Sequence, residues 1–226
     1  MLKKIGFTAL VISIPICILL TTIQFIVLWD GFFESQYKEN NVIENTSIKL
    51  DHLMDITDEI QGYLFGQRDD LFISSIIGGQ EGQVFKEREI IHMEDVKSLF
   101  HGGILLRNAS ILLLLIFGIF FWRKDKIKLY QAMKYSAVSF VIFGIIFGWM
   151  ITQDFNKYFV IFHKIFFRND FWILNPAESV LINMVDIHFF MNIVKLILGI
   201  SSPIILFIGV LGVYLQRKSK QEIYSK

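Results

Sequence analysis

Four long apolar stretches alternate with polar segments along the chain. The apolar stretches are residues 5–28, 104–122, 135–151 and 189–215. A helix of about 20 residues, rising about 1.5 Å per residue, spans the hydrocarbon core of a bilayer. The pattern therefore predicts an all-α membrane protein with four transmembrane helices, in segments 1–28, 104–122, 135–151 and 189–215.

Lysine and arginine are concentrated in three short segments beside these stretches. They are Lys3 and Lys4, then Arg123, Lys124, Lys126, Lys128 and Lys134, then Arg217, Lys218, Lys220 and Lys226. Short cytoplasmic segments of membrane proteins carry an excess of basic residues. We therefore expect a basic cytoplasmic loop at 123–134, a cytoplasmic tail at 216–226 and both termini inside. Segments 29–103 and 152–188 would then form an extracytoplasmic, partly helical cap.

The first cap segment has three recognisable parts. Residues 47–65 place apolar side chains at helical spacing opposite acidic ones, which predicts an amphipathic helix that ends at Gly66. The β-prone run LFISSII and the turn-rich GGQEGQ after it could form a small β-hairpin. The stretch FKEREIIHMEDVKSLF, residues 85–100, is expected to be helical.

The second cap segment begins with many aromatic residues and continues with NPAES. Asn175 suits an N-cap, Pro176 the first helical position and Glu178 the first turn, so a short helix is expected to begin there.

Composition supports the membrane assignment and excludes several classes of function. Of the 226 residues, 54% are apolar and 23 are phenylalanine. Both proportions are above those of an average soluble protein. The net charge of +1 comes without a basic groove interleaved with aromatics, so no nucleic-acid partner is expected. The one cysteine, Cys17, excludes a disulfide within the chain, so the cap must be held together by burial.

Two histidines lie beside the membrane, one in each cap segment. On a helix, Glu89 and Asp95 lie three residues either side of His92, and Arg88 lies four before it. His163 lies among aromatic residues expected at the level of the lipid headgroups. Such histidines are often simple interfacial anchors, and a charged helix before a membrane segment is often just a solvated face.

Two sequence blocks favour a more specific interpretation. FKEREIIHMEDVKSLF and HKIFFRNDFWILNP resemble the signature blocks of the lipoprotein intramolecular transacylase family of bacterial membrane proteins. Those blocks read E-R-E-x-x-H-M-x-D-V-K, and H-x-x-F-F followed by Trp and Pro. The resemblance covers nearly the whole chain. One departure lies at VDIHFF, where Asp186 and His188 stand in place of an expected proline and acid.

The resemblance implies a reaction and a set of site residues. It implies catalytic roles for His92 and His163 and supporting roles for Glu89, Arg88, Asp95 and Lys97, and we expect Phe166 and Trp172 to bind substrate. The family moves the sn-2 acyl chain of a diacylglyceryl-modified N-terminal cysteine onto the α-amino group of that cysteine, leaving a lyso-form lipoprotein. The expected partners are such lipoproteins and membrane lipid, in the bacterial plasma membrane, with no cofactor and no metal.

The chemistry is compatible with two histidines because the substrate supplies both amine and ester. No serine or cysteine acyl-enzyme is needed, and imidazole can carry out either proton transfer at neutral pH. The neighbouring carboxylates favour His92 as general base. His163 would then stabilise the developing charge or act as acid, although the two roles could be exchanged.

Two alternatives come from other classes of protein. The histidines could hold a haem or metal in a four-helix membrane protein, although neither lies inside a crossing helix and no further His or Cys completes a ligand set. The chain could also be a non-enzymatic sensor or scaffold, which nothing in the sequence excludes.

Overall fold

The computed structural model describes residues 1–224 and divides into two compact units. One, here called the helical unit, comprises Met1–Ile23, Ile104–Gln153 and the chain from Leu196. The other, the cap unit, comprises Gln24–Gly103 and Asp154–Lys195. Lys226, part of the basic tail in the sequence, lies outside the described residues.

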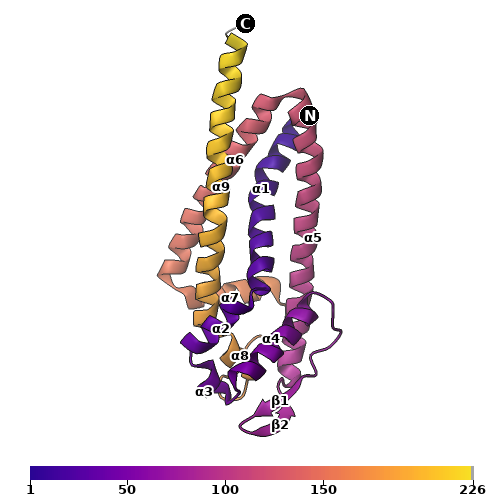
Figure 1. Cartoon of the computed structure of the whole chain (residues 1–226), viewed down its shortest axis with the longest axis vertical. Helices are drawn as coiled ribbons and strands as arrows, with labels where there is room; N and C mark the ends of the chain where they lie inside the picture. Colours follow the sequence, from indigo (N-terminus) through magenta and orange to yellow (C-terminus); the bar gives the residue numbers. More distant parts are fainter. Residues whose placement is uncertain (225–226) are drawn as a thin grey trace. The chain divides into compact units, whose positions relative to one another are not determined.

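Within residues 1–224, four helices are long and apolar enough to cross a membrane. They are α1 (Leu2–Val27), α5 (Glu87–Lys124), α6 (Lys126–Gln153) and α9 (Ile187–Tyr224), which run alongside one another in the helical unit (Figure 1). The prediction of an all-α membrane protein with four transmembrane helices is confirmed. Helix α5 has 38 residues, so its first turns, residues 87–103, belong to the cap unit and precede the apolar stretch.

The helical unit is held together by apolar contacts and close helix packing. Leu10 of α1, Phe121 of α5 and Ala132 of α6 form one buried cluster. At Gly212 of α9, a Cβ atom would lie 2.7 Å from the carbonyl oxygen of Tyr130 on α6, so the absence of a side chain allows the two helices to approach. Small residues have this role in many membrane helix pairs.

The basic segment 123–134 was expected to be a loop, and this expectation is wrong. Asp125 alone separates α5 from α6, and its Oδ1 accepts the Lys128 N–H at 3.2 Å, which caps α6. Lysine and arginine are good helix formers, and the segment contains no glycine or proline. Charge marks the end of an apolar stretch but does not end a helix.

The cap unit contains the two elements expected in its first half. Helix α4 (Leu50–Leu64) buries Leu53 and Ile56 and stops two residues before Gly66, whose φ of +76° is the left-handed conformation expected of a helix stop. Strands β1 (Ser74–Ile77) and β2 (Gln80–Gln83) form an antiparallel hairpin through Gly78 and Gly79, both with positive φ (Figure 1).

Other elements of the cap unit were not predicted. Helices α2 (Asp30–Glu39) and α3 (Val42–Thr46) precede α4, and α7 (Phe155–Phe166) follows α6. The side chain of Asp154 caps α7 by accepting the Lys157 N–H at 3.0 Å.

The short helix α8 (Val180–Met184) begins later than expected. Its N-cap is Ser179, whose hydroxyl accepts the Ile182 N–H at 3.3 Å. Asn175 does not cap a helix; its side chain accepts the Ala177 N–H, and its carbonyl accepts the N–H groups of Glu178 and Ser179. Asparagine readily forms such local turns, which compete with helix initiation.

Candidate active site

The cap unit brings together the two histidines that the sequence singled out. His92 lies on α5 and His163 on α7, and their ring centroids are 6.0 Å apart. Both side chains are buried, with exposed fractions of 8% and 7%. A histidine that merely anchored the protein at an interface would be expected to remain exposed.

His163 is surrounded by an aromatic cage. Its members and their ring-centroid distances from His163 are Phe159 at 4.3 Å, Trp172 at 4.8 Å, Phe167 at 5.4 Å and Phe162 at 5.5 Å. Phe167 also lies edge-on to His92 at 5.2 Å. The two imidazoles therefore share an apolar environment that disfavours charge.

The hydrogen bonds distinguish the two rings. Nδ1 of His163 lies 2.7 Å from the carbonyl oxygen of Phe159, and a carbonyl can only accept, so Nδ1 carries a proton. In neutral His163 the lone pair is then on Nε2. Nδ1 of His92 is buried and has no hydrogen-bond partner among the described residues.

Burial favours the neutral form of both histidines. It lowers the pKa of His92 to about 4, helped by His163 and opposed by the carboxylate of Asp95. Burial also lowers the pKa of His163, against a raising effect of its hydrogen bond to Phe159. Both rings are therefore neutral at pH 7.

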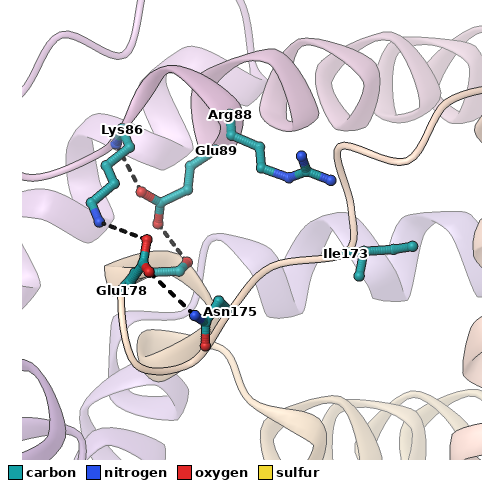
Figure 2. Close-up of a pocket in the computed structure, with 7 residues that line it drawn as sticks. Lys86, Arg88, Glu89, Ile173, Asn175 and Glu178 are labelled. Carbon is teal, nitrogen blue, oxygen red and sulfur yellow. Dashed lines mark hydrogen bonds and ion pairs between the residues drawn. The ribbon is translucent and has the colours of Figure 1, made fainter.

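Glu89 joins the start of α5 to the start of α8. It is 1% exposed; its Oε2 accepts the Lys86 N–H at 2.7 Å, and its Oε1 accepts the Ser179 hydroxyl at 2.6 Å and the Leu181 N–H at 2.8 Å. Lys86, Glu89 and Ser179 border an open pocket of about 360 Å³, where Glu178 pairs with Lys86 (Figure 2). None of the bonds made by Glu89 reaches His92, so this carboxylate holds two helix ends together.

Arg88 and Asp95 both bind the loop of residues 168–172, here called the Asn169 loop. Arg88 points away from Glu89 (Figure 2), donates to the carbonyl of Asp170 and lies 5.6 Å from the ring centroid of Phe171. Asp95 accepts the side-chain amide of Asn169 at 2.8 Å. Because Arg88, His92 and Asp95 are spaced i, i+4 and i+7, one face of α5 carries a catalytic candidate between two attachments to the loop.

Two other predicted residues lie apart from the histidine pair. Lys97 donates to the carbonyl of Arg68 at 3.0 Å and lies 4.0 Å from the ring centroid of Tyr63. Phe166 is 51% exposed, and its ring lies 4.8 Å from that of Phe162. Of the two residues expected to bind substrate, Trp172 therefore contacts His163, whereas Phe166 faces outward from α7.

The two residues at the departure from the family pattern are also separate from the site. Asp186 accepts the Phe189 N–H at 2.8 Å and so caps α9, and His188 is exposed. Among residues 1–224, no group of three or more His, Cys, Asp or Glu side chains could hold a metal ion.

Sequence reasoning missed two contributors to the site. Ser179 and Asn169 bind Glu89 and Asp95, respectively, and both lie in irregular backbone where no periodicity marks them. Phe159 could have been recognised as a partner, because it lies four residues before His163 in a run that can be read as a helix.

Solved structures share this fold over nearly the whole chain. The in meso structure of the membrane-integral lipoprotein intramolecular transacylase Lit from Bacillus cereus is 22% identical, with a TM-score of 0.83 over 97% of this chain and 98% of that one. A structure of that protein with a histidine-to-alanine mutation matches at 22% identity and TM-score 0.79, over 97% and 96%. Another structure of that protein, with a histidine-to-arginine mutation, is 21% identical, with a TM-score of 0.79 over 98% of this chain and 95% of that one.

A family model provides the assignment that these distant structural matches cannot. No curated protein sequence matches the chain. The model of the family described as lipoprotein intramolecular transacylase Lit matches residues 8–190, a range that includes both histidines and the Asn169 loop. The chain therefore belongs to the lipoprotein intramolecular transacylase Lit family and is a multi-pass membrane enzyme of the acyltransferase class.

Proposed function

We propose that the chain moves the sn-2 acyl chain of a diacylglyceryl-modified lipoprotein to the α-amino group of the same N-terminal cysteine, with His92 and His163 as the proton-transfer pair. The observation that carries the proposal is the pair itself: two buried imidazoles 6.0 Å apart, supplied by two separate cap segments. Each lies in one of the two blocks that resemble the family.

The reaction needs little from the enzyme besides positioning and proton transfer. The amine nitrogen attacks the ester carbonyl, a base removes a proton from that nitrogen, and the carbon–oxygen bond to the glyceryl group breaks. The proton returns to the glyceryl oxygen, so an amide and a free hydroxyl are formed. Holding amine and ester of one molecule in attacking geometry replaces capture on an enzyme nucleophile.

The geometry favours His163 as the general base. This exchanges the roles of His92 and His163, a possibility that the sequence left open. Its Nε2 carries the lone pair, and the carbonyl of Phe159 stabilises the cation that forms when Nε2 takes a proton. His92, with a pKa of about 4, is a weaker base at neutral pH. We assign neutral His92 to donate a hydrogen bond to the developing oxyanion or to the leaving oxygen.

The exposed side of α7 supports contact with lipid. Ile161, Phe162, Ile165 and Phe166 are exposed there, while His163 is buried. Exposed Lys157 and Lys164 on the same helix complete the pattern of an amphipathic helix at a membrane surface. An acyl chain could thus reach the cage from the lipid side of this helix.

The basic segments support a topology with both termini in the cytoplasm and the histidines at the extracytoplasmic face. Labelling of single cysteines in whole cells tests this orientation. A cysteine at position 70 should react with an impermeant reagent added outside. Labelling of that position only after the membrane is opened would contradict the topology.

The proposed reaction can be tested by a crossover experiment. Two synthetic diacylglyceryl lipopeptides of different peptide mass are mixed with the purified enzyme, one of them carrying a deuterated sn-2 chain. Mass spectrometry should find the deuterated chain on the amine of its own peptide alone. A deuterated chain on the other peptide would contradict intramolecular transfer, and no N-acylation of either would contradict the function.

A further inference from the structure

Asn169 connects the first sequence block to the aromatic cage. Its side-chain amide donates to Oδ2 of Asp95 at 2.8 Å, and its side-chain oxygen accepts the Phe171 N–H at 3.1 Å. Its backbone carbonyl accepts the indole N–H of Trp172 at 2.9 Å. One residue thus fixes the Asn169 loop to α5 and also fixes the direction of the Trp172 indole.

We propose that Asn169 is a positioning residue that sets the indole of Trp172 against the ring of His163, an inference that rests on the proposed function. The two rings are tilted by only 32°, with centroids 4.8 Å apart, so the indole presents much of its face to the imidazole. The face of an indole attracts a cation at this distance. Trp172 therefore stabilises His163 in the protonated form that follows proton removal from the amine.

The contacts require an asparagine at this position. The loop needs a donor toward the carboxylate of Asp95 and an acceptor toward the N–H of Phe171, and one amide side chain supplies both. Aspartate would place a second carboxylate beside Asp95, and alanine would leave both groups unpaired. Asp95, the acid of the first block, thereby helps to position the Trp172 indole against the histidine of the second block, through Asn169.

Arg88 holds the same loop on the other side of His92, through the carbonyl of Asp170. Attachment on both sides limits how the loop can move relative to α5. A small shift of the loop would move the indole relative to His163, and misplacement of catalytic groups by about 1 Å can cost about 10²-fold in rate.

Four variants of the full-length enzyme test the inference, with a synthetic diacylglyceryl lipopeptide as substrate: Asn169→Ala, Asn169→Asp, Asp95→Asn and the double variant Asp95→Asn/Asn169→Asp. Asn169→Ala should lower kcat about 10-fold or more, and Asn169→Asp should lower it further because two carboxylates then face each other. The double variant restores an amide–carboxylate pair in the reverse direction, so its kcat should exceed that of Asn169→Asp at least about tenfold.

Asn183→Ala provides the matched control. Asn183 is also half-buried in the cap unit, and it donates to the carbonyls of Pro176 and Ser179 without contacting the cage. Its replacement should leave kcat within about twofold of wild type.

The pH profile separates positioning from a general loss of structure. When the indole no longer faces His163, the pKa of this base falls, so the low-pH limb of kcat should move about half a pH unit lower in Asn169→Ala. A variant that is merely less well folded does not move this limb to lower pH.

Any of three results would overturn the inference: kcat of Asn169→Ala within twofold of wild type, no recovery in the double variant, or an unmoved low-pH limb. If these occur while His163→Ala is inactive, only the role of Asn169 fails. If His163→Ala itself remains active, the proposed function fails.

Discussion

The segment around His92 is a regular helix rich in charge, whereas the segment around His163 is a short helix followed by an irregular loop rich in aromatic side chains. In the first, Arg88, Glu89 and Asp95 all bind groups of the second segment. In the second, Phe159 and Trp172 lie against His163. Charged side chains of the first segment therefore bind the second segment, and aromatic side chains of the second segment surround His163.

Among the described residues, no carboxylate is hydrogen-bonded to either imidazole. Glu89 accepts the Lys86 N–H of its own segment and the Ser179 and Leu181 donors of the second segment, and Asp95 accepts the Asn169 amide. A full carboxylate–imidazole pair would raise the pKa of the histidine. In its place, the carbonyl of Phe159 orients His163, while burial keeps both rings neutral.

The largest effect outside the histidines is expected at the charged junction. In Glu89→Gln, an NH₂ group replaces one of the two carboxylate oxygens. In one orientation of the amide the Lys86 N–H loses its acceptor, and in the other the Ser179 hydroxyl and the Leu181 N–H lose theirs. Leaving such buried donors unsatisfied should lower the free energy of unfolding by about 1–3 kcal/mol and lower activity well beyond tenfold. Thermal unfolding in detergent and lipopeptide conversion measure the two effects.

Glu178→Gln is the matched control for Glu89→Gln. Glu178 borders the same pocket and pairs with Lys86 (Figure 2). That pair is 3.5 Å long, and both side chains are more than half exposed. Exposed pairs contribute about 0–1 kcal/mol. If the two variants behaved alike, Glu89 would not join the segments in the way described.

A smaller effect is expected at the aromatic segment. Trp172→Phe keeps a ring against His163 but removes the indole N–H, and Trp172→Leu removes the ring altogether. We expect kcat to fall about 10-fold in the leucine variant and by less in the phenylalanine variant, because cation–π attraction contributes about 0.5–2 kcal/mol. Equal losses in both variants would show that the indole N–H matters and the ring does not.

The last expected effect concerns the pH dependence of stability. The unfolded pKa of histidine is about 6.5 and that of folded His92 is about 4, so the unfolded chain binds more protons between these values. Stability should therefore decrease as the pH falls from about 6.5 toward 4, by at most about 1.4 kcal/mol per pH unit from this residue. His92→Gln should flatten the dependence of the unfolding temperature on pH in this window, and an unchanged slope would contradict a neutral, buried His92.

The sequence predicted the parts of this molecule that periodic patterns encode. Apolar stretches predicted the four long helices, and the spacing of Leu53 and Leu64 predicted α4. The pairing of His92 with His163 was anticipated from two blocks resembling one family, because periodicity alone does not show which loops meet.

The remaining features depend on contacts between residues far apart in the chain. Asn175 matched the pattern of a helix start, but its side chain made a local turn and Ser179 capped α8. Asn169 had no signal at all, because a single amide in a loop gains its role only when Asp95 of α5 lies beside it. The carboxylates of Glu89 and Asp95 favoured His92 as general base, whereas the fold directs those carboxylates to other donors.

The proposed function requires two buried histidines, from two different segments, to transfer the protons of the reaction. The most direct measurement is the conversion of a synthetic diacylglyceryl lipopeptide to its N-acyl lyso form by purified His92→Ala and His163→Ala enzymes, with His52→Ala and His188→Ala as controls. Loss of a positioned acid or base costs about 10²–10⁴ in rate. Each of the first two variants should therefore lose about 100-fold or more while remaining folded in the membrane, and the controls should stay near wild type. A rate above about one tenth of wild type in either His92→Ala or His163→Ala would contradict the account.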